Sequence, residues 1–411
     1  MDATFFRENR QALGELMEEN SIAIFFSGKA PRKSADLFYD FEVDRNFFYL
    51  SGLNQEDLVL VLSKTGSKLK EQLYLPPVDD YYEKWYGILM RPEQAKKLSG
   101  LEQILPRTQF LPEINRLIGS FGEETKVYLY SDYVEWEEPE NAYRQFARQV
   151  KGLHPYARIF NAQPMMTELR SMKSDPEIEE ITKAIGITKA AFTSALSAMQ
   201  PGKFEYEIRS EIDYQIMKSG SCPSFPTICA SGRNATILHY ASQRDRIEDG
   251  SLVLMDFGAC SENYCADITR TIPANGKFTD RQKTLYSIVL EAQALAISLM
   301  KPGISMVTVN DAVKAHYATA LSAIGLIRDA SEVDRYYYHN IGHPLGLDPH
   351  DLRNQDKILR TQQVYTVEPG LYLREEGIGI RIEDDVLITK EGAVVLSKDI
   401  IKEISDLENA R

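Results

Sequence analysis

The sequence has few cysteines, which limits the kinds of protein it can encode. Its 411 residues include four cysteines, and no two of them form a Cys-x-x-Cys pair. Four cysteines are too few to stabilise a chain of this length by disulfide cross-links, so we expect reduced thiols rather than a disulfide framework. Cys260 and Cys265 flank a predicted turn and could bridge, but the reduced state is the expectation.

Long apolar runs and an excess of basic residues are also missing. No stretch approaches the roughly 18 consecutive apolar residues of a membrane-spanning helix, so no membrane association is expected. The first residues show no basic start followed by an apolar segment, so no secretory signal is predicted. The formal net charge of -13 argues against nucleic-acid binding, and together these features favour the cytoplasm as the location.

The order of predicted elements divides the chain into two domains. Strands alternate with helices at the start, which predicts a small α/β domain over residues 1–165. Ser174 and Glu177 bracket a helix start with an early proline, so a larger domain over 166–411 follows and the fold class is α+β. Within the first domain we expect helices over 7–19, 92–118 and 138–150, and strands over 22–26, 57–62, 73–75 and 126–130.

The larger domain contains a weak internal repeat. The order helix, Pro-Gly, helix, strands occurs twice, about 100 residues apart, with Pro201-Gly202 and Pro302-Gly303 as the matching breaks. Two similar halves would each contribute a β-hairpin to a shared sheet with helices behind it. The helices expected are 174–199, 206–218, 279–300 and 307–323.

Residues 252–270 have the pattern of a β-hairpin. An apolar run ends in Asp256, turn-forming residues follow, and a second short run begins at Asp267. If the turn centres on Ser261-Glu262, the two aspartates lie directly opposite each other, with Cβ atoms roughly 4.5–5.5 Å apart. Two carboxylates in that arrangement need a cation, a shared proton or solvent between them. A solvated hairpin with two surface aspartates is the open alternative.

The second half carries its own acidic pair. A β-branched and aromatic run over 364–367 ends in Glu368. Further on, isoleucines at 378, 380 and 382 alternate with a face that carries Arg381 and Glu383, which is the period of a strand. An edge strand that turns its charged face to water is the alternative.

Histidines cluster near these acidic segments. Three of the six lie in one Gly- and Pro-containing loop, at His339, His343 and His350. His239 lies just before the first hairpin, and we expect His154 and His316 to be structural. Four carboxylates with one histidine make an oxygen-rich site for two divalent metals, in which Mn²⁺ or Mg²⁺ is favoured and Zn²⁺, Co²⁺ or Fe²⁺ can also bind. Such a pair lowers the pKa of a shared water, which suits hydrolysis of a peptide bond.

Seven segments together resemble the motifs of the pita-bread metallopeptidases, a group that includes aminopeptidase P (Xaa-Pro aminopeptidase), prolidase, methionine aminopeptidase and metal-free creatinase. In chain order they are His239-Tyr240, Met255–Gly258, Ala266–Arg270, His339–His343, Gly346–Asp351, Thr366–Gly370 and Gly377–Asp385. The resemblance implies a pita-bread fold with pseudo-twofold halves over residues 166–411. It also implies a creatinase-like N-terminal domain that serves oligomerisation and caps the site.

The resemblance also assigns roles. Asp256 would bind one metal, Asp267 and Glu383 would bridge both, and His343 and Glu368 would complete the second. Mn²⁺ is the usual activator in proline-specific members, and a hydroxide that bridges the metals would be the nucleophile. The residues implied to bind substrate, stabilise the intermediate or move protons are His239, His339, His350, Glu368 and Arg381.

Two segments of the first domain favour aminopeptidase P. Residues 40–53 are similar to the domain that aminopeptidase P and prolidase share, and Glu83–Gly87 resembles a segment whose tryptophan, here Trp85, reaches a neighbouring subunit's site. We therefore expect a homodimer or homotetramer that cleaves peptides with proline second. Prolidase and, more remotely, a non-catalytic peptide-binding module are the alternatives. After Asp351 the chain departs from the family pattern, with Leu352 and Arg353 where a glycine commonly follows.

Overall fold

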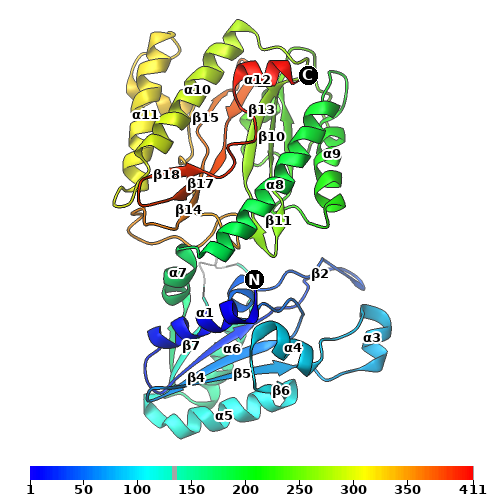
Figure 1. Cartoon of the computed structure of the whole chain (residues 1–411), viewed down its shortest axis with the longest axis vertical. Coiled ribbons are helices and arrows are strands. Elements are labelled where there is room, and N and C mark those ends of the chain that lie inside the picture. Colours follow the sequence, from blue (N-terminus) through cyan, green and yellow to red (C-terminus); the bar gives the residue numbers. More distant parts are fainter. Residues whose placement is uncertain (132–136, 411) are drawn as a thin grey trace. The chain divides into compact units, whose positions relative to one another are not determined.

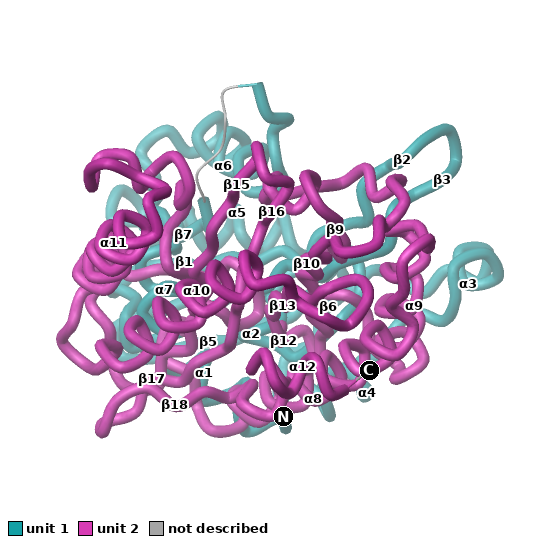
Figure 2. The backbone as a smooth tube through the Cα atoms, turned by 90° about the horizontal axis from the view of Figure 1, so that it is seen from above, with its two compact units in different colours: residues 1–169 teal, residues 170–411 magenta. Residues whose placement is uncertain are grey.

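The computed structural model describes residues 1–131 and 137–410, and its chain divides into two compact units, 1–169 and 170–411 (Figure 2). Each unit has its own sheets and its own helices. Among the described residues, no helix is both long enough and apolar enough to cross a membrane.

A mixed sheet forms the centre of unit 1. Its strand order is β6-β5-β4-β1-β7-β8, and the central strand β1, Ser-Ile-Ala-Ile-Phe-Phe, is almost fully buried. Helix α5 places Phe110, Ile114 and Ile118 on one face at a spacing of four residues, and these pack against the sheet. The strands are β1 Ser21–Phe26, β2 Arg32–Ser34, β3 Leu37–Phe38, β4 Val59–Thr65, β5 Lys68–Leu75, β6 Ile104–Pro106, β7 Lys126–Leu129 and β8 Arg158–Asn161. The helices are α1 Ala3–Leu16, α2 Arg45–Ser51, α3 Asp80–Tyr86, α4 Pro92–Ser99, α5 Phe110–Phe121, α6 Ala142–Leu153 and α7 Gln163–Ser171, the last of which crosses the division.

The single helix predicted over 92–118 is wrong. Gly100 adopts a left-handed conformation (φ 70°) that ends α4, and β6 then joins the sheet beside β5 before α5 begins. The first helix also begins earlier than predicted, because the Asp2 carboxylate accepts hydrogen bonds from the amides of Thr4 and Phe5.

Unit 2 confirms the predicted repeat of two helices followed by strands. Each half opens with a capped helix, through Ser174 with Glu177 in α8 and through Thr279 with Gln282 in α10. The helices are α8 Asp175–Ala198, α9 Glu205–Lys218, α10 Asp280–Leu299, α11 Met306–Ala323 and a short α12 Ile404–Asn409. Helices α8 and α9 lie along one flank of the unit, and α10 and α11 lie along the other (Figure 1).

The strands of unit 2 form small sheets that meet at the middle of the unit. One sheet has the order β13-β10-β9, a second has β14-β17-β18, and β15 pairs with β16. The amide of Glu383 donates to the carbonyl of Thr269, and the Thr271 hydroxyl donates to the carbonyl of Arg381, so the two halves are hydrogen-bonded. The strands are β9 Ile228–Ser231, β10 Leu252–Phe257, β11 Cys260–Ser261, β12 Tyr264–Cys265, β13 Ile268–Pro273, β14 Val364–Val367, β15 Gly370–Leu373, β16 Ile378–Arg381, β17 Asp384–Ile388 and β18 Ala393–Val395.

The first hairpin forms, but its predicted register is wrong. Asp256 lies opposite Thr269 rather than opposite Asp267. The reason is the turn, which centres on Glu262-Asn263 with φ of 45° and 67°. Positive φ at both central residues is the signature of a type I′ turn, whose twist matches that of the flanking strands. Side chains alternate along a strand, so Asp267 still shares a face with Thr269 and is a diagonal neighbour of Asp256.

Candidate active site

Strand ends in the middle of unit 2 carry most of the predicted metal ligands. Asp256 lies near the end of β10, Asp267 directly precedes β13, and Glu368 directly follows β14. Glu383 lies between β16 and β17, and His343 lies in the loop before β14. Each predicted ligand is therefore fixed by the hydrogen bonds of an adjoining strand or by contacts to one.

Three of these residues converge within ligand distance of a common point. Asp267, His343 and Glu383 each offer a ligand atom within 4.8 Å of the others. Nε2 of His343 lies 3.6 Å from Oδ2 of Asp267 and 3.7 Å from Oε1 of Glu368. Four of the five predicted ligands thus share one cluster.

His343 is held in the form that a metal ligand needs. Its Nδ1 lies 3.1 Å from the carbonyl of Pro344, to which it donates when the ring is neutral. Burial, with the charge of His350 as the next cause, lowers the pKa of His343 to about 3. The lone pair of Nε2 therefore points at Asp267 and Glu368, and the backbone carbonyl fixes this tautomer.

Arg381 connects Asp256, the fifth predicted ligand, to the cluster. Its Nη2 donates to Oδ2 of Asp256 at 2.7 Å and its Nε donates to Oγ1 of Thr269 at 2.9 Å. The Thr269 hydroxyl in turn donates to Oε2 of Glu383 at 2.7 Å. Arg381 therefore orients acids from both halves and offsets part of their charge.

Both alternatives in which the acids face water are wrong. Asp256 and Asp267 are 9% and 5% exposed, and Arg381 and Glu383 are 4% and 2% exposed. The strand with alternating isoleucines is fully buried, because β15 pairs with β16 along one edge, and α10, β10, β13 and residues 232–236 pack around it.

Burial and mutual repulsion dominate the electrostatics of the cluster. Burial, followed by the charges of Glu383 and Asp256, raises the pKa of Asp267 well above its usual range. Burial and the charge of Glu368 do the same to the pKa of Glu383. Burial raises the pKa of Glu368 to about 8, although Arg381 opposes the shift. A nearby dication would reverse these shifts by favouring the ionised forms.

The residues fit a divalent metal centre. Oδ1 of Asp256 is buried and, among the described residues, has no hydrogen-bond partner, although Oδ2 is paired with Arg381. A buried carboxylate oxygen without a donor is costly, and a cation satisfies it. Several carboxylates and a neutral imidazole are ligands that hard and borderline divalent ions accept.

The remaining predicted histidines surround the cluster with different exposure. The ring of His350 lies 4.1 Å from that of His343 between centroids, and the charge of His239 is one cause, after burial, of the lowered pKa of His350. Both His239 and His350 nevertheless keep part of their surface exposed to solvent. His339 is less accessible, and its Nε2 lies 2.8 Å from the Tyr372 hydroxyl.

Two histidines lie elsewhere. His316 contacts the carbonyl of Ile288 on α10, and His154 contacts Asn115 within unit 1.

Three residues of this cluster were missed from sequence. Thr269 lies between Arg381 and Glu383, and Tyr372 lies between Arg381 and His339. Oδ2 of Asp385 accepts the amide of Asp267 at 3.2 Å. Strand periodicity could have found the first two, because Thr269 is two residues from Asp267 and Tyr372 is four from Glu368.

The chain matches two protein-family descriptions. Residues 179–390 match the metallopeptidase family M24, and residues 6–128 match the aminopeptidase P N-terminal domain. The M24 match spans the whole predicted ligand set. The chain belongs to metallopeptidase family M24.

Relatives of known activity place the chain among the Xaa-Pro aminopeptidases within this family. The predicted enzyme class and fold are therefore confirmed. The Xaa-Pro aminopeptidase of Haemophilus influenzae is 34% identical over 98% of this chain and 96% of its own. A structure from Bacillus anthracis, described provisionally as an aminopeptidase P, is 39% identical with a TM-score of 0.97, covering 100% of this chain and 98% of its own. Aminopeptidase P from Escherichia coli with the inhibitor Pro-Leu is 32% identical with a TM-score of 0.90, at the same coverage.

Removing one charge from the cluster tests the ligand set. Asp267→Asn keeps the size of the side chain but loses the anionic oxygen nearest His343. We expect at least a tenfold loss of metal affinity, since even the partners behind metal ligands change that affinity about 10- to 100-fold. Metal content after dialysis against limiting Mn²⁺ measures it.

The matched control is Asp249→Asn, which removes a charge from an exposed aspartate. It should leave the metal content of the protein unchanged. Equal metal content in Asp267→Asn and wild type would show that Asp267 is not a ligand.

Proposed function

We propose that the chain removes the first residue of cytoplasmic peptides whose second residue is proline, with two divalent metals, Mn²⁺ above all, in the acidic cluster. The observation that carries this is the convergence of Asp267, His343, Glu368 and Glu383, beside Asp256, in a chain whose relatives are Xaa-Pro aminopeptidases. When bound, the metals would activate a water as the nucleophile and polarise the peptide carbonyl.

The proposed ligands divide by position. Asp267 and Glu383 belong to the converging set and, as the family resemblance implies, would be shared by both metals, while His343 and Glu368 would complete the ligands of one and Asp256 those of the other. Glu368 also has the exposure to exchange protons with a bound substrate, because its side chain is 19% exposed.

The exposed histidines are placed to contact the peptide. After burial, the charge of His239 is the next cause that lowers the pKa of His350, so the two histidines lie near each other. A donor at that position can hydrogen-bond the carbonyl oxygen as it gains negative charge. His339 and Arg381 both contact the Tyr372 hydroxyl and would hold the wall of the pocket.

Proline at the second position sets a particular chemical requirement. The nitrogen of the scissile bond is the proline ring nitrogen and carries no hydrogen, so a site that must hydrogen-bond a substrate N–H at this bond fails there. The ring nitrogen must also be protonated as it leaves. A Pro-Leu dipeptide inhibits the Escherichia coli relative, and the same dipeptide would be the product that this chain releases from an Xaa-Pro-Leu peptide.

Prolidase is the second candidate, because the same cluster would hydrolyse an Xaa-Pro dipeptide. A prolidase would require a group that binds the free C-terminal carboxylate of the dipeptide. A binding module without catalysis is disfavoured, because all five predicted ligands are present in the chain.

Three peptides separate these candidates. The enzyme would be stripped with a chelator, refilled with Mn²⁺, and given Ala-Pro-Ala, Gly-Pro and Ala-Ala-Ala. We expect release of alanine from Ala-Pro-Ala only, and loss of that activity when the metal is removed. Amino acids released over time are measured by chromatography.

The contrary outcomes are equally specific. Cleavage of Gly-Pro alone would establish a prolidase. Cleavage of Ala-Ala-Ala at a similar rate would contradict proline specificity. No cleavage despite bound metal would favour the binding module.

We also propose that the N-terminal domain mediates a homodimer or homotetramer, with Trp85 capping the partner's site. Helix α3 has no buried residue, and exposed apolar side chains lie on it and just after it. Its most exposed members are Ile88 at 84%, Tyr81 at 71%, Trp85 at 68% and Tyr86 at 67%. Aromatic side chains gathered in this way are typical of protein interfaces.

Trp85→Ala tests the capping role. We expect a several-fold lower kcat/KM for Ala-Pro-Ala, because the pocket would lose an apolar wall supplied by the partner. The control is Leu153→Ala, which removes another exposed apolar side chain, 73% exposed on α6, and should leave kcat/KM unchanged. Unchanged kinetics in Trp85→Ala, or a monomer with full activity, would contradict the proposal.

A further inference from the structure

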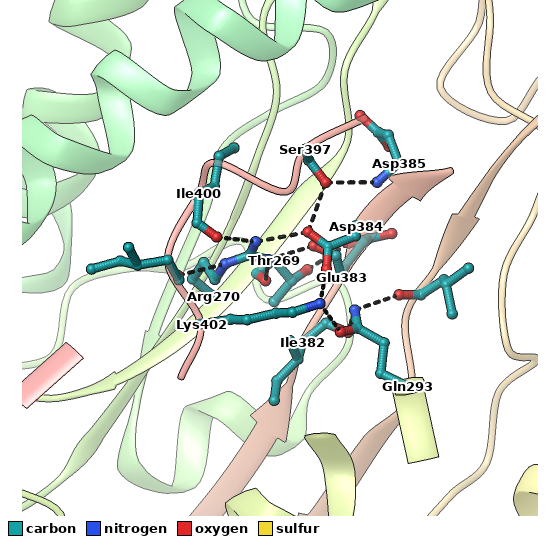
Figure 3. Close-up of polar contacts among 12 residues, drawn as sticks. Thr269, Arg270, Gln293, Ile382, Glu383, Asp384, Asp385, Ser397, Ile400 and Lys402 are labelled. Atoms are coloured by element: carbon teal, nitrogen blue, oxygen red, sulfur yellow. Dashed lines mark hydrogen bonds and ion pairs between the residues drawn. The ribbon is translucent and has the colours of Figure 1, made fainter. Parts of the chain in front are cut away.

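A buried polar network lies behind the strands that carry the acidic cluster (Figure 3). It contains Arg270, Gln293, Asp384 and Lys402, and the chain segment from Ser397 to Lys402 passes beside it. That segment follows residue 390, where the match to the M24 family ends. None of these side chains was needed to build the ligand set.

Gln293 contacts the backbone immediately before both glutamates of the cluster. Its Nε2 donates to the carbonyl of Val367 at 3.1 Å and to that of Ile382 at 3.0 Å. Val367 precedes Glu368, and Ile382 precedes Glu383. One amide group on α10 therefore fixes the spacing between two residues that approach the site from separate strands.

Lys402 determines which way that amide faces. Its Nζ donates to Oε1 of Gln293 at 2.7 Å and to Oδ2 of Asp384 at 2.6 Å. A lysine has only donors, so it can accept no hydrogen bond from the amide and must face the oxygen. The NH₂ of Gln293 is consequently directed at the two carbonyls.

Arg270 makes the corresponding connection for the first half. Its Nη1 donates to the carbonyls of Thr269 and Glu383, and its Nη2 donates to Oδ1 of Asp384 at 2.8 Å and to the carbonyl of Ile400. The side chain is fully buried. Asp384 is thus held between two cations, and the C-terminal segment is bonded to strands of both halves.

We propose that Gln293 and Lys402, with the segment 397–402, are positioning elements of the metal centre. They fix the backbone at Val367 and Ile382, and thereby the distance between Glu368 and Glu383, without touching metal or substrate. Partners behind ligands commonly change metal affinity about 10- to 100-fold. This inference rests on the proposed metal centre.

The test compares Gln293→Leu and Lys402→Met with wild type by titration of Mn²⁺ into the metal-free protein against a competing chelator. We expect both variants to bind Mn²⁺ at least about tenfold more weakly, with a lower kcat and a nearly unchanged KM. Lys402→Arg, which keeps the charge and the donors, should restore most of the affinity.

Gln282→Leu is the matched control. Gln282 is also a buried glutamine on α10 that donates to a backbone carbonyl, that of Gly250, but it lies at the start of the helix. Its loss should lower the melting temperature and leave the metal affinity unchanged.

Wild-type Mn²⁺ affinity in folded Gln293→Leu and Lys402→Met, or an equal loss of affinity in Gln282→Leu, would overturn the inference. A further outcome separates the two proposals. If wild type binds metal but cleaves no Xaa-Pro peptide, the proposed function is refuted. Weaker Mn²⁺ binding by the variants would still support the positioning role of Gln293 and Lys402.

A separate observation concerns Cys260 and Cys265, which lie opposite each other in the hairpin with Sγ atoms 3.7 Å apart. Their amides bond outward, to the carbonyls of Cys222 and Gly346, while the next pair is bonded within the ladder, from Ala266 to Ala259. The cysteines therefore form a non-hydrogen-bonded pair, in which Cα atoms are about 4.5 Å apart. That separation lies within the range of about 4.4–6.8 Å for disulfides.

From this geometry we infer a site of reversible disulfide formation. The two thiols lose two protons and two electrons to a low-molecular-weight disulfide such as oxidised glutathione, which is released as two thiols. The product would link β11 to β12 two residues before Asp267. It would also break the contact of the Cys265 Sγ with the carbonyl of Leu347, in the loop that carries His343 and His350.

A Cys222→Ser variant, which lacks the exposed neighbouring thiol, is suited to the test. After incubation with oxidised glutathione and digestion without reductant, we expect a peptide with Cys260 and Cys265 joined and two hydrogens lost, reversed by dithiothreitol. Cys260→Ser in the same background should abolish it. Thiols that stay reduced, or a lasting glutathione adduct on Cys260, would overturn this inference.

Discussion

Repulsion among buried carboxylates is the constraint on which the rest of the catalytic unit depends. Two like charges about 4 Å apart cost roughly 1 kcal/mol in water and about 4 kcal/mol at an effective dielectric constant of about 20. Asp256, Asp267, Glu368 and Glu383 face this repulsion together. Burial is the largest cause of the raised pKa values of Asp267, Glu368 and Glu383, and the charges of neighbouring carboxylates add to it. Arg381 compensates for one charge at most. The fold therefore has to hold the acids together by other contacts until bound cations compensate for their remaining negative charge.

The repeated architecture explains how those contacts arise. Each half supplies a pair of acids at strand ends, and hydrogen bonds from Glu383 to Thr269 and between Thr271 and Arg381 bring the two pairs together. Neither half could build the site alone, because Asp267 and Glu383 come from different halves. The helices on the two flanks bury the sheets from outside, which leaves the inner strand ends as the place where charge accumulates.

The sequence predicted the acids and the repeat but not their exact register. Asp256, Asp267, Glu368 and Glu383 stand out because acidic residues at the ends of apolar runs are unusual. The turn could not be placed to the residue, since Ser261-Glu262 and Glu262-Asn263 are both polar pairs, and only the left-handed conformation of Glu262 and Asn263 decides between them. The split of the predicted helix 92–118 depends on pairing of β6 with β5, which is a long-range contact. Gln293 and Lys402 carry no sequence signal, because they bind backbone carbonyls that any residue could provide.

There is a physical reason why Gln293 and Arg270 contact backbone carbonyls near the acids rather than the carboxylates themselves. A side chain that contacted the carboxylates directly would compete with the metals for their lone pairs, as a second arginine would. Contacts to the carbonyls of Val367, Ile382 and Glu383 fix the strand positions and leave the carboxylate oxygens available. The cations Arg270 and Lys402 pair with Asp384, whose carboxylate also accepts a hydrogen bond from Ser397 of the C-terminal segment (Figure 3). The network can therefore be rigid and charged without occupying the carboxylate oxygens of the site, and those carboxylates stay available to ionise when divalent ions bind.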